Sequence, residues 1–385
     1  MTRTLVIDVR RSVVAVAALF TCNGLLVGAW GGSLPGLRNM LDLRDVHIVG
    51  ALVTAGVFAV VAMQFSGRLA DRHGARVPSF TGAAIIVASC PVIASARSYP
   101  HLLAGAALFG LGNGVMDVAM NALGVRVEQA RGKPVMSRFH AMFSIGNFLG
   151  AGLVVGIGAL VGADLAARLP LLAAAAVAVA ALAAVWTRAP QTGPTPEEAG
   201  GGGRIPLVAW LLAAMALCFG LTEGTAVDWS SIHVTDVAHV AASTGAWGLA
   251  CVSAFMVLIR LAGDHAVVRF GRRTVVGGGA ACAMAGYLIT AFASALPLIL
   301  VGWCLVGFGV GLLAPQIYAL SGHIGGGRTM ALVVGFGYAA FLTGPAIIGT
   351  VTVHAGIQRA MLVPLATAVG LVLMARRMPP DPERG

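Results

Sequence analysis

Apolar stretches of about 20 residues follow one another along almost the whole chain, separated by short polar segments. About 20 consecutive apolar residues are needed for a helix to cross the hydrocarbon core of a bilayer. The pattern therefore predicts an all-α membrane protein with twelve transmembrane helices, over residues 12–34, 47–68, 77–96, 101–125, 137–161, 169–186, 206–230, 244–262, 274–295, 297–321, 329–353 and 356–374.

The segment between the sixth and seventh stretches has a different composition. Residues 187–205 contain three prolines, two adjacent glutamates and a run of four glycines, at positions 200–203. Such a segment cannot form a packed element and is typical of a flexible linker. We therefore expect a six-helix bundle over residues 1–186, a cytoplasmic linker over 187–205 and a second six-helix bundle over 206–385.

Short internal similarities indicate that the two bundles are pseudo-symmetric, as in transporters built from repeated halves. Asp71 and Asp264 fall in matching segments between apolar stretches. The other matches are Gly110-Leu111-Gly112-Asn113-Gly114 with Gly307-Phe308-Gly309-Val310-Gly311, Phe148-Leu149 with Phe341-Leu342, and Asn23-Gly24 with Glu223-Gly224.

The composition supports a membrane protein and sets its orientation. Hydrophobic residues make up 58% of the chain and charged residues 10%, whereas soluble domains have about 25% charged residues. The net charge of +10 does not indicate nucleic-acid binding, because the basic residues lie between apolar stretches. Most of them fall on one side, which predicts a multi-pass protein of the cell inner membrane with both termini cytoplasmic. The outer segments hold only Arg38, Arg44, Arg97, Arg168 and Arg359.

The sequence contains no pattern that indicates an enzyme. The six cysteines all lie in apolar stretches without a CxxC pair, and no HExxH, P-loop or nucleophile elbow is present. We therefore expect no metal, no cofactor and no disulfide framework. The basic N-terminus precedes a long apolar stretch that we interpret as the first span, not as a signal peptide.

A dense polar segment at residues 67–76 lies between the second and third apolar stretches. We interpret it as a tight loop in which glycines allow the turn and an acid accepts hydrogen bonds at a neighbouring helix start when the cytoplasmic side is closed. The alternative is a basic loop that only fixes topology. The candidate gating residues are Gly67, Asp71, Arg72, Gly74 and Arg76, with Asp264, Arg269, Gly271 and Arg272 in the second half.

Acidic residues inside predicted spans are the main functional candidates. A charge at the bilayer centre costs about 2.5 to 3.5 kcal/mol, so such a residue faces a wet cavity, pairs with a partner or becomes protonated. Asp117 shares a helical face with Asn113 and Asn121, and no predicted span has a lysine or arginine near its centre. We expect Asp117 to contact protons or substrate; the alternative is a stripe of hydrogen bonds that joins helices.

Glu223 and Asp228 lie in the seventh span. A regular helix would separate them by about 140°, unless Gly224 lets the helix unwind. For Asp228 the alternative is a solvated helix end beside an interfacial Trp229. Further candidates for a polar cavity are Asn23, Gln64, Asn147 and Gln316. Two more expectations are an ion-pair network or plain solvated loop around Glu128, Arg131, Arg138 and His140, and interfacial positions for Trp30, Trp229 and Trp247.

Residues 67–76 resemble the signature that the major facilitator superfamily carries between its second and third helices, and residues 263–273 resemble its partner between the eighth and ninth. Residues 121–128 and 223–230 are similar to a bacterial inner-membrane branch near the fucose-permease-type transporters. One departure weakens a drug-antiporter reading. The fifth span has Gly150-Ala151-Gly152 where those antiporters often carry Gly-Pro, and Gly344-Pro345 stands in the eleventh.

The resemblance implies two bundles that rock about a midplane site. The leading hypothesis is a proton-coupled secondary transporter of a small organic solute that acts as a monomer in the lipid bilayer. Asp117 and Glu223 would be its proton or substrate groups. The alternatives are an efflux antiporter for drugs or metabolites and, from another class, a non-transporting membrane sensor or scaffold.

Overall fold

The computed structural model describes residues 8–132, 135–190 and 206–379. Within these residues every regular element is a helix, and twelve helical segments are long and apolar enough to cross a membrane. The predicted all-helical fold with twelve spans is therefore confirmed. Some side chains inside helices lie outside the description, namely those of residues 67–68, 70–73, 137, 264, 322–323, 325–328 and 330–331.

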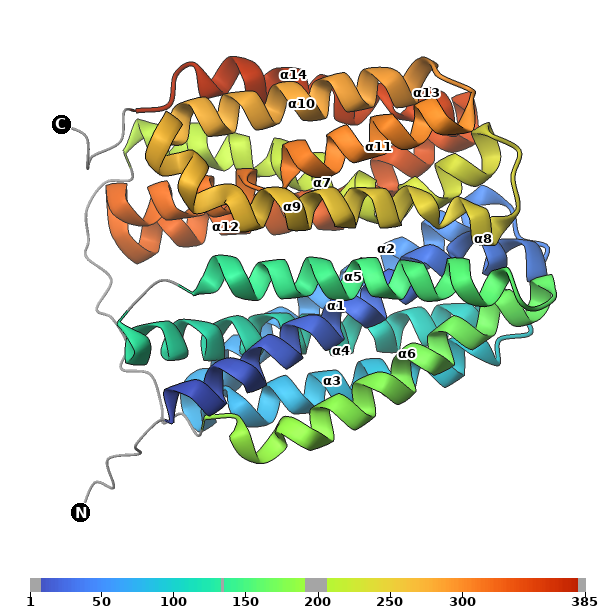
Figure 1. Cartoon of the computed structure of the whole chain (residues 1–385), viewed down its shortest axis with the longest axis horizontal. Helices are drawn as coiled ribbons and strands as arrows, with labels where there is room; N and C mark the ends of the chain where they lie inside the picture. The colour runs from blue at the N-terminus through green and yellow to red at the C-terminus, as the bar shows by residue number, and fades with distance from the viewer. Residues whose placement is uncertain (1–7, 133–134, 191–205, 380–385) are drawn as a thin grey trace. The chain divides into compact units, whose positions relative to one another are not determined.

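The chain divides into two compact units, Met1–Glu197 and Glu198–Gly385. In unit 1 the helices run side by side (Figure 1). Helix α1 packs against α5 and α6, α4 packs against both α2 and α3, and α3 also contacts α6. The elements are α1 (Val9–Met40), α2 (Asp45–His73), α3 (Arg76–Ala94), α4 (Tyr99–Arg131), α5 (Met136–Gly158), α6 (Ala163–Val185) and the 3-10 turn η1 (Trp186–Arg188).

Unit 2 repeats this arrangement. Helix α7 packs against α12 and α14, α11 packs against both α9 and α10, and α10 also contacts α14. Helix α12 supplies the end of the tenth span and all of the eleventh. The elements are α7 (Leu207–Val237), α8 (Ala242–Gly245), α9 (Trp247–Phe270), α10 (Arg272–Phe292), α11 (Leu296–Val310), α12 (Leu313–Ala355), α13 (Ile357–Ala360) and α14 (Leu362–Ala375).

Glycines at the helix contacts fix the register between the repeats. A Cβ at Gly110 would collide with the carbonyl oxygen of Ala55, and a Cβ at Gly307 would collide with that of Val252. Gly307 follows Gly110 by 197 residues (307 − 110), and Val252 follows Ala55 by the same number (252 − 55). The same separation relates the contacts of Gly112 with Gly82 and Ile86 to those of Gly309 with Gly279 and Ala283.

The polar segments that we expected as loops are mostly helical. Helix α2 continues to His73 and α9 to Phe270, and the turns occur at Gly74 (φ 83°) and Gly271 (φ 80°). These are left-handed conformations that glycine adopts without steric strain. Charged residues do not end a helix where it leaves the hydrocarbon, so the polar segment extends α2 and forms no long loop.

The structural register also corrects one sequence match. Gly74 and Gly271 are 197 residues apart (271 − 74), so Val268 stands in the place of Asp71. Asp264 lies one helical turn earlier in its segment. The two acids share a segment but not an equivalent position.

Candidate functional site

A buried ion pair joins two helices of unit 2. Arg260 of α9 donates from Nη2 to Oε1 of Glu223 on α7, at 3.3 Å, and the two side chains are only 6% and 13% exposed. Glu223 therefore has a basic partner inside the bundle, although Arg260 lies near the end of the predicted eighth span and not near its centre. Two buried charges are tolerated because each compensates the other in a region of low dielectric constant.

Arg260 also donates a hydrogen bond at the break between helices α11 and α12. Arg260 Nε donates to the carbonyl of Gly311, at 3.0 Å, between the end of α11 and the start of α12. Pro315 explains why this carbonyl needs a donor, because proline has no N–H to give to the residue four positions earlier. Arg260 thus ties α9 to the broken helix and to Glu223 at once.

A second chain of hydrogen bonds starts next to Glu223. The Tyr287 hydroxyl of α10 donates to the backbone carbonyl of Thr222, and the hydroxyls of Thr222 and Thr367 lie 2.9 Å apart. Tyr287 and Thr222 are fully buried. Four helices of unit 2 therefore supply the polar groups around Glu223: α7, α9, α10 and α14.

Asp228 lies on a different face of α7 from Glu223. The helix is continuous through Gly224 and extends to Val237, so the two acids keep their angular separation of about 140°. Asp228 is half-buried and lies within the helix, not at its end. The interfacial positions expected for Trp229 and Trp30 are wrong, since these side chains are 1% and 4% exposed. Trp247 is 45% exposed.

Unit 1 contains the polar face predicted on the fourth span. Asn121 donates from Nδ2 to the backbone carbonyl of Asp117 at 2.8 Å and to its carboxylate Oδ1 at 3.2 Å. Asp117, Asn121 and Asn113 are all half-buried on α4. The amide of Asn121 thereby orients the Asp117 carboxylate, which lies near the middle of a 33-residue helix.

Two asparagines on α1 and α5 present unsatisfied acceptors. Asn23 is 1% exposed and donates to the Met120 sulfur at 3.7 Å, while Asn147 is 2% exposed. The side-chain oxygen of each is buried without a hydrogen-bond partner among the described atoms. Gln64, by contrast, is exposed on the apolar face of α2 that also presents Val57 and Val61.

Two candidate gating residues begin helices, Arg76 at the start of α3 in unit 1 and Arg272 at the start of α10 in unit 2. Arg272 Nε donates to Oε1 of Gln316 at 3.0 Å, so Gln316 is a partner of the arginine-rich segment. Arg76 and Arg273 donate to the backbone carbonyls of Trp186 and Arg376, one clamp in each unit. Arg269 lies over the Phe270 ring. The structure does not describe the side chains of Arg68, Asp71, Arg72 and Asp264, and it gives Gly67 only as part of helix α2.

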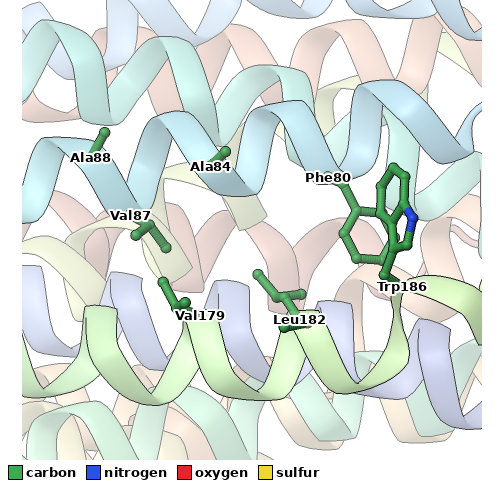
Figure 2. Close-up of a pocket in the computed structure, with 8 residues that line it drawn as sticks. Phe80, Ala84, Val87, Ala88, Val179, Leu182 and Trp186 are labelled. Atoms are coloured by element: carbon green, nitrogen blue, oxygen red, sulfur yellow. The ribbon is translucent and has the colours of Figure 1, made fainter.

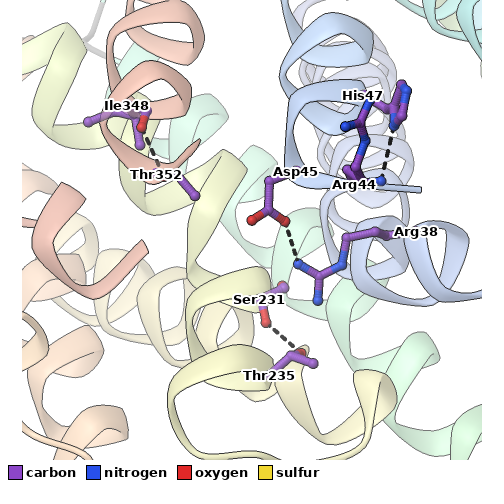
Figure 3. A network of polar contacts seen from close by, with 8 residues as sticks. All are labelled: Arg38, Arg44, Asp45, His47, Ser231, Thr235, Ile348 and Thr352. Carbon is purple, nitrogen blue, oxygen red and sulfur yellow. Dashed lines mark hydrogen bonds and ion pairs between the residues drawn. The ribbon is translucent and has the colours of Figure 1, made fainter. Parts of the chain in front are cut away.

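Two polar contacts join successive helices of unit 1. Glu128 Oε2 accepts hydrogen bonds from the backbone N–H groups of Val135 and Met136, at 2.6 and 2.9 Å, and so caps helix α5. At the opposite ends of the helices, Arg38 pairs with Asp45 at 2.9 Å (Figure 3). Both contacts hold successive helices of unit 1 together.

Comparison with known proteins identifies the family. The family model of the Major Facilitator Superfamily matches residues 16–265. The chain belongs to the Major Facilitator Superfamily. It is therefore a multi-pass membrane transporter of this superfamily and not an enzyme.

The similar curated proteins are bacterial. An uncharacterized transporter of Sinorhizobium fredii is 31% identical, over 87% of this chain and 89% of its own. An uncharacterized MFS-type transporter of Yersinia pestis is 28% identical, over 94% and 92%. The membrane protein MosC of Rhizobium meliloti is 26% identical, over 93% and 88%. The sequence of this chain is thus similar to those of uncharacterised bacterial transporters.

Solved structures agree on the fold. The nucleoside transporter NupG superimposes with a TM-score of 0.74 at 12% identity, covering 96% of this chain and 99% of NupG. The peptide transporter POT gives a TM-score of 0.70 at 15% identity, covering 97% and 99%. At these identities the likeness concerns the fold alone.

Proposed function

We propose that the protein is a proton-coupled secondary transporter of a small polar organic solute that works by alternating access. Glu223 and Asp117 are the proposed proton-binding groups. The observation that carries this proposal is the buried Glu223–Arg260 ion pair inside a membrane-spanning bundle.

Protonation of Glu223 would change the energy of the contact between α7 and α9. Two opposite charges attract strongly where the dielectric constant is low, and a neutral carboxyl loses most of that attraction. Access of water to the pair shifts the balance between the charged and neutral forms. Proton binding and the conformational state are then linked, because each state of the transporter binds the proton with a different affinity.

Asp117 would supply a second titratable group, in unit 1. Its carboxylate is held by Asn121, so it has a fixed orientation near the middle of α4. The competing role is structural, in which Asp117 and Asn121 only join helices. If Asp117 binds protons during transport, it must be able to change its charge. If its role is only structural, an amide side chain at this position would serve that role equally well.

The solute class follows from the unsatisfied acceptors on α1 and α5. A buried amide oxygen without a donor costs about 1 to 3 kcal/mol. Hydroxyl, amine or amide groups of a solute would satisfy Asn23 and Asn147 in a conformation that exposes these two oxygens, which are buried in this one. We therefore propose a solute rich in hydrogen-bond donors.

Purified protein in proteoliposomes with an internal pH dye tests the function. A thermal-shift screen of sugars, nucleosides, amino acids and drugs selects ligands, because a ligand of the native state raises its stability. We expect a selected solute to enter together with protons. Proton movement opposite to the solute would favour the antiporter alternative. Solute flux without proton movement would refute coupling.

Three variants separate coupling from structure. Glu223→Gln and Asp117→Asn keep shape but cannot titrate, so we expect loss of pH-driven accumulation with solute exchange retained. Asp45→Asn is the matched control, because Asp45 also pairs with an arginine within one unit. Uphill transport that survives in both Glu223→Gln and Asp117→Asn would remove them from the coupling mechanism.

A further inference from the structure

An apolar groove lies on unit 1 between α3 and α6 (Figure 2). Its volume is about 370 Å³, in the lower part of the range for small-molecule sites. Both helices are candidate membrane spans, so the groove lies at membrane depth. It is lined by Phe80, Ala84, Val87, Ala88, Val179, Leu182, Ala183 and Trp186.

The groove results from small residues between larger ones. Ala84 and Ala88 are exposed one turn apart on α3, and Val87 faces Val179 of α6 (Figure 2). Phe80 and Trp186 close one end, where their rings meet edge to face at 4.6 Å (Figure 2). From Phe80 to Ala88 the groove follows α3 for about 12 Å.

Positive charge stands at the aromatic end. Arg76, the first residue of α3, places its guanidinium 4.6 Å from the centre of the Trp186 ring and donates from Nη2 to the Trp186 carbonyl at 2.6 Å. Arg188 follows Trp186 by two residues and is exposed. Tryptophan and arginine together are typical of the level of lipid headgroups.

We propose that this groove binds an anionic phospholipid, with one acyl chain between α3 and α6 and the phosphate group at Arg76 and Arg188. The apolar walls match the chain, and arginine guanidinium groups bind phosphate oxygens through charge-assisted hydrogen bonds. The structure therefore offers both parts of a lipid site in one place.

The headgroup must supply the selectivity. An acyl chain gains little by leaving the bilayer for the groove, because lipid tails are as apolar as its walls. Attraction between arginines and a net negative headgroup does discriminate. The site should therefore prefer phosphatidylglycerol, which is anionic, to phosphatidylethanolamine, which has no net charge.

The second unit provides an internal control. Arg273 occupies the position equivalent to Arg76 and donates to the Arg376 carbonyl. Gly277, however, stands where unit 1 has Phe80, and a Cβ there would lie 3.7 Å from the Ala375 side chain. Helices α10 and α14 thus approach directly at this level, without the Phe80–Trp186 pair.

Native mass spectrometry of the full-length protein tests the proposal. The protein is equilibrated in micelles that hold equal amounts of phosphatidylglycerol and phosphatidylethanolamine, and the ratio of bound lipids is measured. We expect wild type to favour phosphatidylglycerol and Arg188→Gln and Arg76→Gln to lower that preference about fivefold. Arg76→Lys and Arg273→Gln should keep it. Ala84→Phe should reduce retention of both lipids.

Thermal unfolding of each variant separates binding from folding. Arg188 is exposed, so Arg188→Gln keeps the test valid even if Arg76→Gln unfolds. Equal binding of the two lipids by wild type would show ordinary annular contact and overturn the proposal. An equal loss of preference in Arg273→Gln would also overturn it, because the effect would then be one of general surface charge.

Discussion

The Glu223–Arg260 pair shows how residue chemistry depends on where a helix ends. The sequence identifies Glu223 as a candidate, but the apolar stretch of the eighth span ends at residue 262, which places Arg260 at the membrane surface. Helix α9 instead runs on to Phe270, ten residues beyond Arg260. A hydropathy pattern detects only the apolar part of a helix and not its polar extension to Phe270, so Arg260 could not be predicted from the sequence as the partner of Glu223.

A double-mutant cycle on this pair gives the first prediction. Arg260→Met and Glu223→Gln each leave one buried charge uncompensated, so each should lower the free energy of unfolding by about 3 to 5 kcal/mol. The double variant should recover most of this loss because no buried charge remains, but it should stay about 1 to 3 kcal/mol below wild type because the Gly311 carbonyl has lost its donor. Unfolding is followed in detergent by the exposure of buried cysteines to a fluorescent maleimide.

The half-exposed Arg38–Asp45 pair is the control for the cycle. The Asp45 side chain is 38% exposed, against 13% for Glu223, so Asp45→Asn should cost about 1 kcal/mol or less. Strict additivity of the Glu223 and Arg260 variants would mean that the two residues do not depend on each other.

At the scale of elements, the sequence predicts the number and order of the spans but not their ends. Helix α4 continues to Arg131, where the apolar stretch ends at residue 125, and α7 continues to Val237. These extensions consist of residues with ordinary helix propensity outside the apolar stretch. The start of α5 is set by a contact seven residues away in the chain, which no local pattern predicts.

Glu128 provides the second prediction. Its carboxylate accepts the N–H groups of Val135 and Met136, where the helix dipole also favours negative charge. Glu128→Ala should therefore destabilise the protein by about 1 to 2 kcal/mol, and Glu128→Gln by less. Hydrogen exchange at the first turn of α5 should become faster.

Helix α12 (Leu313–Ala355) is the internal reference for this measurement, because no side-chain hydrogen bond caps its start. Its exchange should not change in either variant. Faster exchange over both helices would indicate general loosening and not the loss of a cap.

At the scale of the whole chain, internal similarity matched glycine contacts that recur 197 residues apart but paired two acids that are not equivalent. The glycine matches in the fourth and tenth spans follow the structural register because each glycine lies against a neighbouring helix backbone. The Asp71–Asp264 match does not, because these acids are 193 residues apart (264 − 71) and the glycine contacts are 197 apart. Packing constrains position more tightly than surface charge does.

The third prediction concerns orientation across the membrane. The distribution of basic residues predicts that both termini and the 187–205 segment lie in the cytoplasm. Single cysteines introduced at Thr195 and at Asp236, in a background without the six native cysteines, should react with an impermeant maleimide from opposite sides. Labelling of both from the same side would contradict the twelve-span topology.

The 197-residue register implies a history for the charged residues. Residues equivalent to Arg260 and Asp117 in the other repeat are Met63 and Ala314, so these charges occur in one copy only, whereas the glycine contacts occur in both. Duplication of an ancestral half-length gene would leave this record if helix packing was inherited and the charges were acquired afterwards, separately in each copy. The scaffold is then older than its chemistry, and new specificities could evolve on it without rebuilding the bundle.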